Sequence, residues 1–157
     1  MNNSETVQVL MDSVQKGNFE HARTMLADDF QLSGLVSEPI NAETWLGMGA
    51  SLGMAFTNLN YHFKVDSSEG NVVNTTSQLS GTNSGALDLT GLRMGVISAT
   101  NRKFSTVQEN TKITFKDEKV KSWVIEPTEG AGLKAMLGQL GVALPTAYAA
   151  SKAARHK

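Results

Sequence analysis

The first third of the chain follows the hydrophobic period of α-helices. Apolar residues between Val7 and Val14 recur at the i, i+3, i+4 and i+7 positions of one buried helical face, which predicts a helix with Ser4 as its N-cap. Asn18 can cap a second, short helix. Asn41 can cap a third helix over residues 42–56, although glycines lower its intrinsic stability. Three N-terminal helices are therefore expected.

From Leu59 onward the hydrophobic period changes to two, which is typical of β-strands with one buried face. A last helix is expected after Pro127, because apolar residues return to helical spacing there, and Gly141 is its expected C-cap. The expected strands are residues 59–65, 72–82, 103–116 and 120–126, and the last two are joined by a tight turn at 116–119.

Helices followed by a run of antiparallel strands predict an α+β fold. We expect a cone-shaped barrel in which the N-terminal helices pack on a strongly curved, mainly antiparallel β-sheet, with a C-terminal helix. Residues 1–145 would form this single domain, and the basic residues 146–157 a flexible tail. The interior of such a cone is a natural pocket for a hydrophobic small molecule.

Composition narrows the possible partners. The 157 residues contain 14 Lys and Arg against 15 Asp and Glu, so the net charge of -1 gives no strong attraction to nucleic acid or to an anionic membrane. The chain has no cysteine, and its three histidines are too far apart in sequence to form a local metal motif. We therefore expect a cytoplasmic protein without metal, cofactor, nucleic-acid or membrane partners.

Three segments carry a resemblance to a known superfamily. They read GNFEHARTMLADDFQLSG (residues 17–34), AFTNLNYHFKVDSSEGNVVNTTSQLSGTNSG (55–85) and KDEKVKSWVIEPTEGAGLKAMLGQLGV (116–142). Their order and spacing resemble the nuclear transport factor 2-like superfamily, and within it the SnoaL-like polyketide cyclase branch. The resemblance implies the cone-shaped fold and a homodimer formed through the outer face of the sheet.

The sequence departs from this branch at its chemistry. The family's frequent histidine in the Gly-Thr-x-[ST]-Gly step is Asn83 here, and the aspartate often found just after the last-strand tryptophan is missing, since Trp123 precedes Val124. Two functions stay open. One is a small-molecule-binding protein with an apolar cavity. The other is a cofactor-free polyketide cyclase or ketosteroid-isomerase-like enzyme that uses Glu109 as general base.

Glu109 and Tyr61 are the candidate catalytic residues. Glu109 shares the expected inward face of its strand with Val107, and burial there would raise the pKa of its carboxyl toward the range of a general base. Alternatively, Glu109 lies in water or pairs with Arg102 or Lys103. The phenol of Tyr61 could donate a hydrogen bond to an oxyanion, or could simply be a core residue with its hydroxyl at the rim.

The expected ligand-binding residues are mostly aromatic or apolar side chains of the cone interior. Asn83 is included because its amide could orient a substrate carbonyl; a turn asparagine is the alternative interpretation. His62 alternates with Tyr61 and is expected to point away from the interior. The expected ligand-binding set is Trp45, Met48, Phe56, Phe63, Asn83, Thr111 and Trp123.

Overall fold

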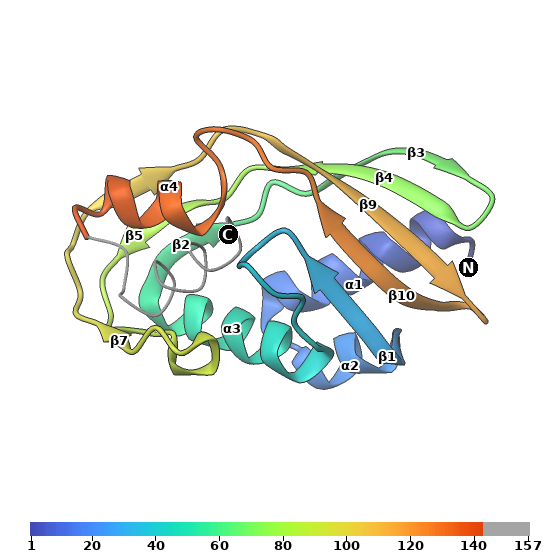
Figure 1. The fold of residues 1–157 in the computed structure, drawn as a ribbon, viewed down its shortest axis with the longest axis horizontal. Coiled ribbons are helices and arrows are strands. Elements are labelled where there is room, and N and C mark those ends of the chain that lie inside the picture. The colour runs from blue at the N-terminus through green and yellow to red at the C-terminus, as the bar shows by residue number, and fades with distance from the viewer. Residues whose placement is uncertain (143–157) are drawn as a thin grey trace, which may run out of the picture.

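The structure is a computed structural model and describes residues 1–142 (Figure 1). The expected domain end at residue 145 and the basic tail at 146–157 lie outside the described residues. Three helices, α1 (Asn3–Lys16), α2 (Phe19–Thr24) and α3 (Ala42–Ala55), occupy the N-terminal part as predicted. No helix in residues 1–142 combines the length and the apolar character needed to cross a membrane.

Asparagine side chains cap all three N-terminal helices. The Asn18 and Asn41 side chains accept hydrogen bonds from backbone N–H groups in the first turns of α2 and α3, which confirms both predicted caps. The prediction for α1 was wrong. Its N-cap is Asn2, because Asn2 and Glu5 form a reciprocal capping box, and Ser4 therefore lies inside the first turn.

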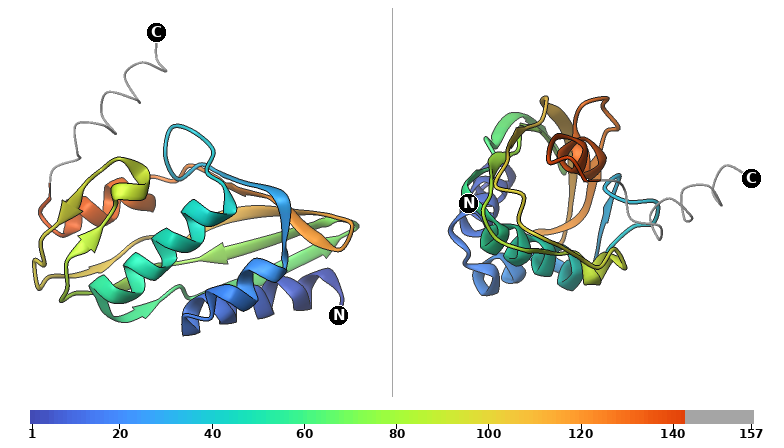
Figure 2. Two further views of the ribbon diagram at one scale, coloured as in Figure 1. Left: turned by 90° about the horizontal axis from the view of Figure 1, so that it is seen from below. Right: turned by 90° about the vertical axis from the view of Figure 1, so that its left-hand side faces the viewer.

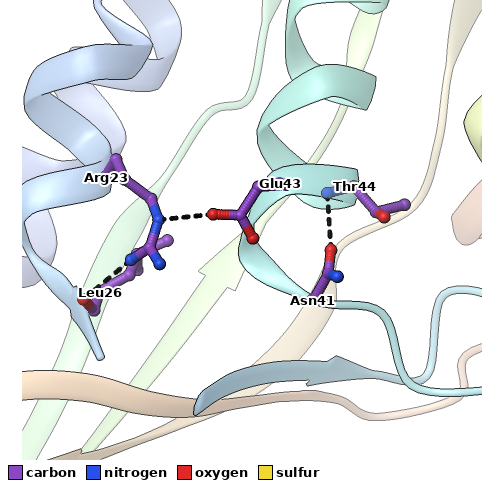
Figure 3. Close-up of polar contacts among 5 residues, drawn as sticks. All are labelled: Arg23, Leu26, Asn41, Glu43 and Thr44. Atoms are coloured by element: carbon purple, nitrogen blue, oxygen red, sulfur yellow. Dashed lines mark hydrogen bonds and ion pairs between the residues drawn. The ribbon is translucent and has the colours of Figure 1, made fainter. Parts of the chain in front are cut away.

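The first turn of α3 is tied to the end of α2 and the start of β1 (Figure 3). Arg23 Nε lies 2.9 Å from Glu43 Oε1, and Arg23 Nη1 donates to the Leu26 carbonyl at 3.1 Å. The backbone N–H of Glu43 and the Arg23 guanidinium both lower the pKa of the Glu43 carboxyl. One arginine thus connects two helices and a strand.

The strands form three sheets. A five-stranded sheet has the order β1-β10-β9-β4-β3, a three-stranded sheet the order β2-β5-β8, and β6 pairs with β7. The β1–β10 pair is parallel and the other pairs are antiparallel. The remaining elements are β1 (Leu26–Ser33), β2 (Phe56–Asn60), β3 (Lys64–Glu69), β4 (Val72–Ser77), β5 (Ser80–Asn83), β6 (Leu87–Asp88), η1 (Thr90–Leu92), β7 (Val96–Ile97), β8 (Lys103–Ser105), β9 (Glu109–Lys116), β10 (Lys119–Ile125) and α4 (Gly132–Gln139).

Three of the expected long strands are each broken into two. Residues 59–65 are split between β2 and β3, residues 72–82 between β4 and β5, and residues 103–116 between β8 and β9. In each case one piece belongs to the three-stranded sheet and the other to the five-stranded sheet. The breaks therefore lie where the two sheets meet, and they produce the sharp bend of the cone.

Backbone hydrogen bonds join the three broken segments at this bend. Gln78 N–H donates to the Tyr61 carbonyl at 3.0 Å, and Thr106 N–H donates to the Leu79 carbonyl at 2.9 Å. His62 has a φ of 45°, in the left-handed region, and this turns the chain from β2 into β3. The bend is thus a hydrogen-bonded feature shared by all three segments.

The hairpin between β9 and β10 agrees with the sequence prediction, whereas the C-cap of α4 is Leu140 and the predicted Gly141 is the next residue. Asp117 and Glu118 both have positive φ, as a two-residue turn between twisted strands requires. Gly141 follows α4 with a φ of 76°, while Val142 N–H donates to the Leu137 carbonyl at 2.9 Å. This pattern closes the helix as a Schellman motif.

Helices α1, α2 and α3 cover one face of the five-stranded sheet, and α4 lies toward the three-stranded sheet at the other end of the molecule (Figures 1 and 2). The buried apolar residues form two clusters. One lies between the N-terminal helices and the five-stranded sheet, and the other joins the end of α3 to β6, β8 and α4. This arrangement confirms the predicted α+β fold with helices on a strongly curved sheet.

Candidate ligand-binding site

A cavity of about 100 Å³ lies where the two hydrophobic clusters meet. Its wall is built from α1, α3, the bend at residues 61–63, the inner faces of β4, β9 and β10, and α4. Met11, Leu52, Leu133 and Met136 are among its apolar lining residues. Seven of the nine site residues expected from the sequence also line it: Trp45, Met48, Tyr61, Phe63, Glu109, Thr111 and Trp123.

Aromatic rings form a continuous part of the wall. The ring centroids of Trp45 and Trp123 are 4.9 Å apart, and those of Phe63 and Trp123 are 6.2 Å apart. Trp45 also stacks on the fully buried Phe30 at 5.5 Å. Such ring pairs fix one another's position, so this side of the cavity is preformed.

The polar residues of the wall gather on β4 and β9 and at the nearby bend. Ser77 of β4 stands directly opposite Glu109 of β9 in the antiparallel register, so both side chains project from the same face of the sheet. Thr111 lies two residues further along this inner face and is buried. Tyr61 lies beside them, since its carbonyl accepts from the N–H of Gln78.

Glu109 is half-buried at the first residue of β9 and lines the cavity. Burial raises the pKa of its carboxyl. Among residues 1–142 no ion pair or side-chain hydrogen bond to this carboxyl is present, and the Arg102 guanidinium lies against Gly141 instead. A carboxyl in this setting can accept a proton or pair with a cation that enters the cavity.

The expected inward alternation begins at Glu109 and does not include Val107. The chain is not in a strand between β8 and β9, and Val107 leaves 47% of its surface exposed while its N–H donates to the Gly130 carbonyl. The shared inward face predicted for Val107 was therefore wrong. The break between the strands resets the register before β9 begins.

The Gln15 side chain fixes the backbone around Tyr61. The Gln15 side chain accepts from Tyr61 N–H at 3.0 Å and donates to the Leu59 carbonyl at 2.6 Å. Burial raises the pKa of the Tyr61 phenol, so the group is protonated at neutral pH and can donate a hydrogen bond. His62 is exposed, contacts Ser80 Oγ at 3.0 Å and does not line the cavity.

Asn83 and Phe56 lie away from the cavity. Asn83 is fully buried at the end of β5, where its amide nitrogen donates to the carbonyls of Ala55 and Gly85. Its side-chain oxygen accepts from both the N–H and the hydroxyl of Thr100 at 2.9 Å. Phe56 packs on Phe104 in the second hydrophobic cluster, at a centroid distance of 5.0 Å. Both residues support the loops around β5.

Several lining residues were not predicted from the sequence, and Ser77 and Met136 are the most informative of them. Met136 belongs to the recognised apolar face of the last helix, and only the position of α4 in space directs it to the cavity. Ser77 could have been found from the two-residue period of β4, in which Val73 and Thr75 are buried and Ser77 is half-buried on the same face. Within residues 1–142 no group of three His, Asp or Glu side chains is arranged to hold a metal ion.

No protein-family model and no curated protein matches the sequence. Solved structures do. IdmH from Streptomyces antibioticus, described as a candidate polyketide cyclase, is 20% identical with a TM-score of 0.66, over 90% of this chain and 100% of that chain. A SnoaL-like polyketide cyclase from Agrobacterium tumefaciens is 12% identical with a TM-score of 0.61, over 82% of this chain and 94% of that chain.

A third solved structure, of a hypothetical protein from Catenulispora acidiphila, has a ketosteroid isomerase-like fold and was determined in complex with trimethylamine. It is 16% identical with a TM-score of 0.61, over 90% of this chain and 96% of that chain. The chain therefore has the fold of these SnoaL-like and ketosteroid isomerase-like structures, which is the fold that the sequence resemblance implies.

Proposed function

We propose that this protein binds a small, largely apolar molecule in the cavity between α3, α4 and the curved sheet. The observation that carries the proposal is the combination of aromatic walls with polar groups that have no protein partner. The hydroxyls of Tyr61, Ser77 and Thr111 and the carboxyl of Glu109 line the cavity without a side-chain hydrogen bond inside residues 1–142.

These polar groups remain available to a ligand. Among the described residues, no fully buried polar side-chain atom lacks a hydrogen-bond partner, so the unpartnered groups of the cavity lining each keep some accessible surface. A ligand that fills the apolar part and donates or accepts hydrogen bonds at this edge would satisfy both parts of the wall.

The size of the cavity limits the ligand. A dry protein cavity of about 150 Å³ can hold benzene, and the cavity here measures about 100 Å³. Met11, Met48 and Met136 line it, and the flexible thioether side chains allow the wall to adapt to the shape of a ligand. With the methionines in these positions, we infer a ligand no larger than a single ring.

Filling the cavity is expected to abolish binding. In Thr111→Leu a larger apolar side chain occupies the cavity, whereas Thr114→Leu makes the same change on the outer face of the same strand, β9. Cyclopentanol should bind to the wild type and to Thr114→Leu but not to Thr111→Leu, as measured by tryptophan fluorescence. Unfolding free energies within about 1.5 kcal/mol of the wild type would show that both variants fold. Equal binding by all three proteins would contradict the proposal.

A second candidate function is proton transfer next to a carbonyl group. It is favoured by one observation, the half-buried and unpartnered carboxyl of Glu109 on the same cavity wall as the protonated phenol of Tyr61. Glu109 would remove the proton and Tyr61 would stabilise the resulting oxyanion, without a cofactor.

We also propose a homodimer formed through the outer face of the five-stranded sheet. Helices α1, α2 and α3 all cover the other face, and on the outer face Val124 leaves 45% of its surface exposed between polar neighbours such as Ser122. Light scattering at high micromolar concentration should give twice the chain mass. The monomer mass would contradict the dimer.

A further inference from the structure

The cavity wall carries charge of one sign only. Of its described lining residues, Glu109 is the one that can carry a charge at neutral pH, and no Lys, Arg or His is among them. The other polar members are hydroxyl groups, of which only the Tyr61 phenol titrates, and burial raises its pKa further. The cavity therefore offers an anion without a cation of its own.

We propose that the ligand of this cavity is a small alkylammonium ion, which pairs with Glu109 and packs its carbon atoms against the aromatic wall. This inference rests on the proposed ligand-binding function and specifies the chemical class of the ligand. It requires a cavity, an unpartnered carboxyl and aromatic rings in one wall, and all three are present.

The aromatic residues suit a cation. Trp45, Tyr61, Phe63 and Trp123 all line the cavity, and the faces of aromatic rings attract cations through the ring quadrupole. Desolvation strengthens this attraction because water no longer competes for the ion. An ammonium group at Glu109 would thus lie beside both a carboxylate and several rings.

The position of Ser77 adds a second acceptor for an ammonium ion. Ser77 stands directly opposite Glu109 across β4 and β9. Directly opposed residues of antiparallel strands have Cβ atoms about 5 Å apart, so both side chains can reach one ligand. An alkylammonium ion has several N–H donors and no acceptor. It could therefore donate to Glu109 and Ser77 together, whereas a neutral alcohol has only one donor to share between them.

Two matched probes test the inference. Cyclopentylammonium and cyclopentanol have the same carbon ring and differ in the charge of one substituent. Trp45 and Trp123 are the only two tryptophans of the chain and both line the cavity, so intrinsic fluorescence reports occupation of this site. Glu109→Gln removes the carboxylate. Glu126→Gln is the control for net charge, because Glu126 is exposed and does not line the cavity.

At pH 8 cyclopentylammonium should bind the wild type about tenfold more tightly than cyclopentanol. This preference should disappear in Glu109→Gln and persist in Glu126→Gln. Lowering the pH protonates Glu109, so the affinity for the ammonium ion should fall while that for cyclopentanol does not.

Two other outcomes are decisive against the inference. If cyclopentanol binds the wild type as tightly as cyclopentylammonium does, the ligand class is wrong and the proposed binding function stands. If neither probe changes the tryptophan fluorescence, the binding function itself fails, and the ammonium proposal fails with it.

Discussion

Glu109→Gln is expected to slow the exchange of the α-protons of cyclopentanone in D₂O by about 10²- to 10⁴-fold, if the protein moves protons next to a carbonyl. The carboxylate of Glu109 would take one α-proton, leaving an enolate whose oxygen accepts a hydrogen bond from the Tyr61 phenol. Glutamine keeps the shape of the side chain but cannot accept the proton. Exchange can be followed by NMR as loss of the α-proton signal.

The pH dependence of this exchange has a fixed direction. Burial raises the pKa of Glu109, and only the ionised carboxylate acts as a base, so the rate should increase as the pH rises through that value. Glu126→Gln should retain the full rate. Exchange that is equally fast in Glu109→Gln, or no faster than in buffer alone, would exclude Glu109 as a base.

Asn83→Asp is expected to lower the free energy of unfolding at pH 7 by about 3 kcal/mol or more. The substitution keeps the shape of the side chain but removes the two hydrogen bonds that the amide donates to the Ala55 and Gly85 carbonyls. An ionised carboxylate would then lie fully buried beside two carbonyl oxygens.

The size of this loss should depend on pH. The buried environment would raise the folded-state pKa of the introduced carboxyl above its unfolded value of about 3.9. The penalty is therefore smallest below the unfolded pKa and grows as the pH rises toward the folded pKa. Urea unfolding at pH 4 and pH 7 measures the difference. Asn74→Asp, on the exposed face of β4, should change stability by less than about 0.5 kcal/mol at both pH values.

The helical part of the fold could be predicted from local pattern because its signals are local. The period of apolar residues in α1 depends only on the helix itself, and the caps Asn18 and Asn41 act within one turn. The α1 cap was misassigned for a related reason. Ser4 and Asn2 are both good caps, and the capping box with Glu5 decides between them.

The strand breaks could not be predicted, because the alternation of side chains continues through the bend. Tyr61 and Phe63 both line the cavity as a continuous strand would require, yet the residue between them, His62, has left-handed φ. The bend depends on hydrogen bonds to Gln15 and Gln78, which are distant in sequence. Only the assembled fold brings these partners together.

Some residues of the candidate site could be predicted from local pattern and others could not. The inward positions of Glu109, Thr111 and Trp123 follow from strand period, and the structure has all three in the cavity wall. The position of Asn83 does not follow, because a polar residue at a strand end can face a ligand or a neighbouring loop. Its hydrogen bonds with Ala55, Gly85 and Thr100 fill its hydrogen-bonding capacity.

The parallel pairing of β1 with β10 limits when the five-stranded sheet can form during folding. Asp29 of β1 and Lys121 of β10 form an ion pair although they are 92 residues apart in the chain. During synthesis, the buried side chains of Phe30 and Leu32 have no partner strand until β10 has emerged from the ribosome. Closure of this sheet edge can therefore begin only after β10 has been synthesised, and it depends on contacts of large sequence separation, which slow folding.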